Sequence, residues 1–450
     1  MKKALSLLLC LALLFSLAPV EIHAEEEEPV TLSLAQGSIV ISATGYAQDG
    51  GAETPYTGDY TIVQTDTTYV DKTIAVTGGE HKITMGSKVV IDVHAISDAC
   101  AFSIAKGASV ELVLTKSVTL KSGENRAGLA VPTGAAVTIS SENRYGVLHV
   151  TGGGRGAGIG GYYGNNTTLY SGGNITILSG TVEATGGSSA AGIGGYSTGT
   201  GKDEQIHISG GKVTATGGSG SAGIGGGSGY SGTGENGQII IDGTAVVTAT
   251  GKDGGAGIGG GSSGDGTGTK GKIILAGSAR VTASADTGAG IGAGASNGAT
   301  TCGTGSYGEI LITESAVVDS GSDSGAGIGG GKPSAYSSGT GSNGRLTING
   351  NAQVTATSTQ AAGIGGGYSS NSTSYSRLTD SAGVISISGN ARVEATGGRW
   401  GIGADFHYGN GALKISGGTV IARATDETVT TACGIGKSGS TTITGGTVEA

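Results

Sequence analysis

Cysteine, proline and tryptophan are scarce in this chain of 450 residues, which contains 4, 5 and 1 of them, respectively. Three cysteines lie beyond residue 24, namely Cys100, Cys302 and Cys433, an odd number at wide spacing and without a CxxC pair. This pattern argues against a disulfide framework and against a zinc site. The few prolines beside 94 glycines, which follow no period of three, exclude a collagen-like helix.

Long apolar runs are missing after residue 24, so no segment of the mature chain is predicted to insert into a membrane. Lys2 and Lys3 precede an apolar run that ends near Val20, and residues 1–24 are predicted to be a signal peptide. The protein is therefore expected to be secreted or associated with the cell surface. Its formal net charge of −9 carries no basic stripe, which argues against nucleic acid as a partner.

The glycines belong to a repeat, in which the triplet Gly-Ile-Gly recurs nine times at spacings of 31 to 38 residues. The central isoleucines are Ile159, Ile193, Ile224, Ile258, Ile291, Ile328, Ile364, Ile402 and Ile435. Leu129 lies 30 residues before the first of them and is predicted to be an earlier member of the same series. Regular apolar placement of this kind argues against a disordered, glycine-rich linker.

Two further motifs occur in each repeat, and both alternate apolar and polar residues as a half-buried β-strand does. The first is Ile-x-Ile, as in Ile206 and Ile208, and the second is Val-x-Ala, as in Val213 and Ala215. The links between the first and second motifs and between the second motif and the triplet are nearly constant. The link from each triplet to the next Ile-x-Ile varies from 8 to 21 residues.

Three short strands per repeat, with all the length variation at one corner, predict an all-β fold. The fold is a parallel β-helix, or solenoid, with three strands per coil of about 31–38 residues. Residues 99–450 are assigned to this solenoid, which is expected to continue beyond residue 450. Residues 25–98 are strand-rich without a clear repeat, so they are either an N-terminal cap or a small separate β-domain.

The segments Ile-Ser-Gly-Gly-Lys-Val-Thr-Ala-Thr-Gly-Gly (208–218) and Ala-Gly-Ile-Gly-Gly-Gly (222–227) resemble repeats in large secreted proteins of Gram-positive bacteria. Those proteins are similar to right-handed parallel β-helices of the pectate-lyase type, which occur in adhesin-like and carbohydrate-binding surface proteins. The resemblance covers about residues 60–450. It implies a right-handed solenoid and a polysaccharide or surface protein as partner, and it transfers no catalytic motif.

Two groups of residues are candidates for ligand binding. Around the eighth triplet, Trp400 and Tyr408 would stack on a sugar while Arg399, Asp405 and His407 supply hydrogen bonds, although a loop packed by its own aromatic residues explains the same cluster. The variable corner is rich in tyrosine among Ser, Asn and Thr, a combination typical of binding loops and also of ordinary solvated loops. The candidates there are Tyr162, Tyr163, Tyr196, Tyr230 and Tyr368.

The hypothesis favoured by these residues is a non-catalytic scaffold for adhesion or glycan recognition, without cofactor or metal. One alternative is a polysaccharide-active lyase or hydrolase, because Asp319 and Glu394 are predicted to point outward two coils apart. Another is a purely structural spacer. An ice-binding array of Thr-x-Thr motifs is disfavoured, since Glu183, Asp319 and Glu394 interrupt it. Ile240, Ile274 and Leu311 are expected to form a small aliphatic patch on another face.

Overall fold

The structure is a computed structural model, and its description covers most of the chain after residue 27. The described residues are 28–65, 68–164, 169–196, 205–229, 237–262, 271–296, 308–332, 344–368, 383–403, 412–428, 432–436 and 440–450. The predicted signal peptide lies outside them. Within these ranges the chain forms β-strands and one short 3-10 helix, η1 (Leu34–Gln36), and no helix there has the length and apolarity to cross a membrane.

The Ile-x-Ile motifs form the first of three ladders of parallel strands, as predicted. Its members are β1 (Val30–Ser33), β5 (Tyr60–Val63), β7 (Glu80–Met85), β10 (Ser109–Leu114), β13 (Ala136–Ser141), β18 (Asn174–Ile177), β21 (Gln205–Ile208), β24 (Gln238–Ile241), β27 (Lys272–Leu275), β30 (Glu309–Ile312), β33 (Arg345–Ile348) and β36 (Val384–Ile387). Alternate residues of each strand point into the core.

The Val-x-Ala motifs form the second ladder. Its members are β8 (Val89–Asp92), β11 (Ser117–Lys121), β14 (Val147–Thr151), β19 (Thr181–Thr185), β22 (Lys212–Ser219), β25 (Val246–Lys252), β28 (Arg280–Ala285), β31 (Val317–Ser322), β34 (Gln353–Ser358) and β37 (Arg392–Gly397). Two long strands, β39 (Ala412–Ala424) and β41 (Ser440–Glu449), run through the first and second ladders together.

The Gly-Ile-Gly triplets form the third ladder, and Leu129 pairs with Ile159 in it, as predicted. Its members are β2 (Ile39–Ile41), β6 (Ile74–Val76), β9 (Phe102–Ile104), β12 (Leu129–Ala130), β15 (Ile159–Gly160), β20 (Ile193–Gly194), β23 (Ile224–Gly225), β26 (Ile258–Gly259), β29 (Ile291–Gly292), β32 (Ile328–Gly329), β35 (Ala362–Gly365), β38 (Trp400–Gly403) and β40 (Cys433–Ile435).

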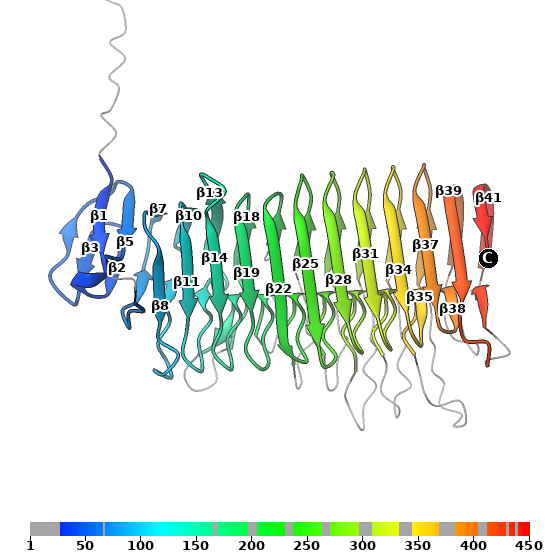
Figure 1. Ribbon diagram of the computed structural model, residues 1–450, viewed down its shortest axis with the longest axis horizontal. Coiled ribbons are helices and arrows are strands. Elements are labelled where there is room, and N and C mark those ends of the chain that lie inside the picture. The colour runs from blue at the N-terminus through cyan, green and yellow to red at the C-terminus, as the bar shows by residue number, and fades with distance from the viewer. Residues whose placement is uncertain are drawn as a thin grey trace, which may run out of the picture.

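The three ladders enclose one continuous core along a right-handed parallel β-helix, and the coils follow one another in chain order along the long axis (Figure 1). The inward residues are almost all Ile, Val, Leu and Ala, and each stacks on its equivalent in the next coil. Strands of adjacent coils lie about 4.8 Å apart, so an inward side chain that lies between two coils is covered from above and below. Burial of these apolar ladders is the main stabilising contribution, because one coil alone could not exclude water from them.

Residues 28–98 begin the same solenoid, because their strands pair directly with the coils that follow in all three ladders. The end of the third ladder is covered by β3 (Gly45–Gln48), which pairs antiparallel with β2, and by β4 (Thr54–Pro55). Leu34 of η1 is buried at the same end of the core. These elements give the solenoid a cap and keep its first coil from exposing apolar side chains.

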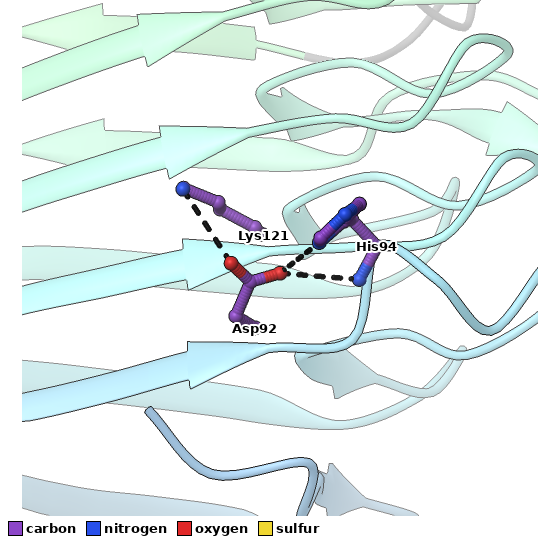
Figure 2. A network of polar contacts seen from close by, with 3 residues as sticks. All are labelled: Asp92, His94 and Lys121. Carbon is purple, nitrogen blue, oxygen red and sulfur yellow. Dashed lines mark hydrogen bonds and ion pairs between the residues drawn. The ribbon is translucent and has the colours of Figure 1, made fainter. Parts of the chain in front are cut away.

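Outward residues of adjacent coils are linked by polar contacts, of which Figure 2 shows one example. Asp92 at the end of β8 lies opposite Lys121 of β11, with its Oδ2 atom 3.5 Å from the lysine Nζ. The other carboxylate oxygen accepts hydrogen bonds from the backbone N–H of His94 (3.3 Å) and from the His94 ring (2.5 Å). The carboxylate thus ties the loop after β8 to the next coil.

Candidate functional site

The variable corner begins where the two chain segments that flank each triplet come back side by side. Ala157 donates its N–H to the carbonyl of Gly161 (2.9 Å), and Ala191 does the same to Gly195 (2.9 Å). This hydrogen bond joins the chain before the triplet to the chain after it. Residues three or four positions before a triplet isoleucine therefore lie next to residues three or four positions after it. Side chains at these positions therefore gather at the base of the variable corner.

Three successive coils bring arginine and tyrosine together at this place, in a group that we call the Arg/Tyr cluster. It consists of Arg126, Arg155, Tyr162, Tyr163 and Tyr196. The guanidinium carbon of Arg126 lies 5.0 Å from the ring centre of Tyr162, and that of Arg155 lies 5.0 Å from the ring centre of Tyr163. Such pairs combine cation–π attraction with flat stacking.

The tyrosine rings of neighbouring coils also touch. The centroids of Tyr163 and Tyr196 are 5.9 Å apart with an edge-to-face angle of 71°. Tyr162 and Tyr163 form the short strand β16 (Tyr162–Tyr163), which pairs antiparallel with β17 (Leu169–Tyr170). Because one strand carries both rings, their backbone is held at the edge of the solenoid while the rings stay half-buried.

Backbone carbonyls anchor the Arg126 side chain, and a backbone hydrogen bond joins the segments that carry Arg155 and Tyr163. Arg126 donates from Nε to the carbonyl of Asp98 (3.0 Å) and from a terminal nitrogen to the carbonyl of Tyr163 (3.4 Å). The Tyr163 N–H in turn donates to the carbonyl of Arg155 (3.0 Å). These contacts fix the position of the cluster before any ligand arrives, which lowers the entropy cost of binding.

Tyr196 is the most buried ring of the cluster, with 8% of its surface exposed. Burial raises the pKa of Tyr196, and the nearby charge of Arg155 offsets this effect only in part. The phenol is therefore neutral at physiological pH. The cluster offers aromatic faces and donors, which suits recognition of a polar ligand.

A smaller version of the same arrangement occurs near the C-terminal end, where Arg399 lies between two aromatic rings. Its guanidinium carbon is 4.6 Å from the ring centre of Tyr368 and 5.9 Å from that of Trp400. Tyr368 follows its triplet and Arg399 precedes the next one. In the Arg/Tyr cluster, by contrast, Arg155 precedes the same triplet that Tyr163 follows.

Trp400 does not offer a sugar-stacking surface, in contrast to the role proposed for it from the sequence. Only 2% of its surface is exposed, since its strand pairs with Ala362 and Cys433 and its ring packs against Gly436. The indole contributes to the packing of the last coils. Tyr230, Asp405, His407 and Tyr408 lie outside the described residues.

The outward carboxylates of the second ladder lie where their spacing predicted. Asp319 and Glu394 face outward with Thr355 between them, and Glu394 pairs with Arg392 of its own strand. In the part of the chain that the structure describes, no three His, Cys, Asp or Glu residues gather in a way that could hold a metal ion. Ile240, Ile274 and Leu311 stack outward on the first ladder and are each partly exposed.

Arg126 and Arg155 were not among the residues that the sequence singled out. In the sequence, Arg126 lies three positions before Leu129, and Arg155 lies four positions before Ile159. Two tyrosines follow the Ile159 triplet. Recognising it requires knowing that the two sides of a triplet lie side by side.

Comparison with known families agrees with the geometry. The chain matches the family described as beta helix repeat over residues 175–198, 206–228, 239–262, 346–368 and 385–406. Each match begins on an Ile-x-Ile strand and ends just after a Gly-Ile-Gly triplet, so it covers one coil without most of its variable corner. No curated protein and no solved structure matches the chain. The protein is a parallel β-helix repeat protein.

Proposed function

We propose that this protein is a non-catalytic scaffold, at or outside the cell surface, which recognises a glycan or a surface protein at its variable corner. The observation that carries the proposal is the Arg/Tyr cluster, in which arginine and tyrosine side chains from three coils converge. Tyrosine provides a large amphipathic contact area at low entropy cost, and arginine adds a rigid set of donors. Both residue types are enriched at binding hot spots.

The alternative of a polysaccharide-active enzyme has less support. A pair of catalytic carboxylates in glycosidases lies within about 10 Å across a site that encloses the sugar. Asp319 and Glu394 lie on an outward strand face, about 10 Å apart by the coil spacing, and Glu394 is engaged by Arg392. We therefore place recognition ahead of catalysis.

The test is binding of the purified protein to a glycan array and to intact cells, combined with an assay for reducing ends and unsaturated products. Tyr163→Ala and Arg155→Ala each remove one side of the central pair, and Arg155→Lys keeps the charge while removing the planar guanidinium. Tyr69→Ala is the matched control, because Tyr69 is 67% exposed and lies outside the cluster. Circular dichroism establishes that each variant is folded.

We expect binding without turnover and a loss of about tenfold or more in affinity for Tyr163→Ala and Arg155→Ala, with Tyr69→Ala unchanged. Arg155→Lys should also bind weakly, because a lysine cannot reproduce the stacked guanidinium. Turnover that Asp319→Ala or Glu394→Ala abolishes would show that the protein is an enzyme. Neither binding nor turnover would favour the structural spacer.

A further inference from the structure

The corner between the first and second ladders carries a second exposed aromatic site, far from the variable corner within each coil. In most coils this corner is a short turn, for example residues 209–211 and 313–316. Residues 142–146, between β13 and β14, make a longer turn with Tyr145 at its tip. Tyr145 is 55% exposed.

Hydrogen bonds hold this turn in one shape. The Tyr145 N–H donates to Oδ1 of Asn143 (2.8 Å), and the Ser141 hydroxyl donates to the carbonyl of Leu114 in the preceding coil (2.9 Å). Gly146 permits the close approach, because a Cβ atom there would lie 2.0 Å from the Ser141 hydroxyl oxygen. Tyr145 is therefore presented by a pre-organised turn.

Two cations lie close to the Tyr145 ring, and they come from adjacent coils. Lys116 Nζ lies 5.5 Å from the ring centre, and the guanidinium carbon of Arg144 lies 5.0 Å from it. Arg144 also donates to the phenol oxygen (2.9 Å), so the phenol proton can be donated elsewhere. Glu142 is exposed on the same turn, yet neither cation forms an ion pair with any described residue.

An exposed leucine extends the site onto the next coil. The turn that contains Leu178 stacks directly on this one, since Thr181 donates to the carbonyl of Gly146 (3.0 Å) and Ser179 Oγ accepts from the Ser141 N–H (2.8 Å). Leu178 is 47% exposed. Lys116, Tyr145 and Leu178 thus belong to three successive coils, which span about 10 Å, the width of one or two sugar rings.

We propose that Lys116, Arg144, Tyr145 and Leu178 form a binding surface for a carboxylated polysaccharide. The C–H face of a sugar would lie on Tyr145 and Leu178, while its carboxylate would accept from Arg144, Lys116 and the phenol of Tyr145. An acidic peptide added as an extra strand does not fit, because β13 already pairs with β10 on one side and with β18 on the other. The surface lies on another corner from the Arg/Tyr cluster and does not depend on the function proposed for that cluster.

The experiment measures binding of the full chain to carboxymethyl dextran by calorimetry over a range of salt concentrations, with unmodified dextran as the matched neutral polymer. Poly-glutamate of similar length and charge is the peptide comparison. The variants are Arg144→Gln, Lys116→Gln and Tyr145→Ala. Arg280→Gln is the matched control, because it removes one exposed charge of the second ladder several coils away.

We expect carboxymethyl dextran to bind and dextran to bind about tenfold or more weakly, with affinity that falls as salt is raised. Arg144→Gln, Lys116→Gln and Tyr145→Ala should each reduce affinity about threefold to tenfold, and Arg280→Gln should not. Equal losses in Arg280→Gln and Arg144→Gln would overturn the proposal, because binding would then follow overall charge. Equal or tighter binding of poly-glutamate would overturn the assignment of a sugar ligand.

Discussion

Gly194 lies so close to Gly225 of the next coil that a Cβ atom on Gly194 would stand 2.1 Å from the Gly225 carbonyl oxygen. Its φ of +134° is also a conformation that residues with a side chain rarely adopt. In the first seven triplets, from Gly160 to Gly365, the glycine after the isoleucine is therefore required for two reasons: the backbone conformation and the spacing of the coils.

Replacing Gly194 by alanine should reduce the free energy of unfolding by about 2–4 kcal/mol, because backbone strain and displacement of the adjacent coil add together. Gly107→Ala is the control, since Gly107 has a φ of +85° but no atom within 4 Å of the added Cβ. That change should cost about 1–2 kcal/mol, from backbone strain alone. Urea denaturation measures both, and equal losses would mean that the contact between coils contributes nothing.

Asp92 is expected to make stability depend on acidic pH. Burial raises the pKa of Asp92, but the hydrogen bonds from His94 and the charges of His94 and Lys121 outweigh burial and hold the pKa below its ordinary value. Because the folded pKa is the lower one, this stabilisation is present above the ordinary pKa of about 4 and is lost as pH falls through the folded pKa.

Asp92→Asn should therefore cost about 0.5–1 kcal/mol at pH 7, and the difference from the wild type should shrink below about pH 4. Denaturation at a series of pH values measures it. Asp319→Asn is the control, since Asp319 is exposed and makes no hydrogen bond with any described residue. A difference that stays constant down to pH 2.5 would contradict the role given to the Asp92 carboxylate.

Tyr60 should limit stability at alkaline pH. Burial in the core near the N-terminal cap, with smaller effects of Tyr56, Tyr46 and Glu53, raises the pKa of Tyr60 to about 12. In the unfolded chain the Tyr60 phenol ionises near pH 10. The contribution of Tyr60 to the free energy of unfolding is therefore intact below pH 10 and is lost as pH rises toward 12. Tyr60→Phe should flatten the loss of stability in that range.

The same change should cost about 1 kcal/mol at pH 7, because it removes the hydrogen bond from the phenol to the Tyr56 carbonyl (3.2 Å). Tyr69→Phe, at an exposed tyrosine, serves as the comparison and should change neither quantity. If the wild type and Tyr60→Phe lose stability over the same alkaline pH range and to the same extent, the ionisation of another group causes that loss.

Cys100, which is partly buried, should be alkylated much more slowly in the native protein than in the unfolded chain. Burial raises the pKa of the Cys100 thiol to about 11, despite hydrogen bonds that involve Ser122 and the backbone. In a protein with Cys10 and Cys302 replaced by serine, iodoacetamide at pH 8 should label exposed Cys433 first and Cys100 about a hundredfold more slowly. In urea the two rates should converge. Rapid labelling of Cys100 in the native protein would show that the coils near β9 open readily.

The ladders could be predicted from the sequence because alternation of apolar residues fixes which side chains face the core. Once Ile206 is aligned with Ile239, the outward register follows, and the predicted separation of Asp319 and Glu394 agrees with the pairing through Thr355. The coils of residues 28–98 could not be recognised from the sequence because their motifs are less regular, although their strands pair in the same way.

The sites were harder to predict, since they depend on contacts between positions distant in the sequence. Tyr162, Tyr163 and Tyr196 were identified by the composition of the variable corner, while their arginine partners were not. Trp400 was assigned to a ligand surface because it is the only tryptophan among polar neighbours, yet its burial depends on the following coil. Lys116 and Tyr145 are 29 positions apart, and only the stacking of coils brings them together.

Because most of the length variation lies at one corner, one whole coil can be removed without changing the register of the others. Deleting residues 239–272 would join Gln238 to Ile273, and Ile273 would then occupy the place of Ile239 opposite Ile206. The molecule would become about 4.8 Å shorter, and its remaining coils would keep their order. The distance between two surface sites on different coils can therefore be changed by one coil spacing at a time, while the packing of the core stays the same.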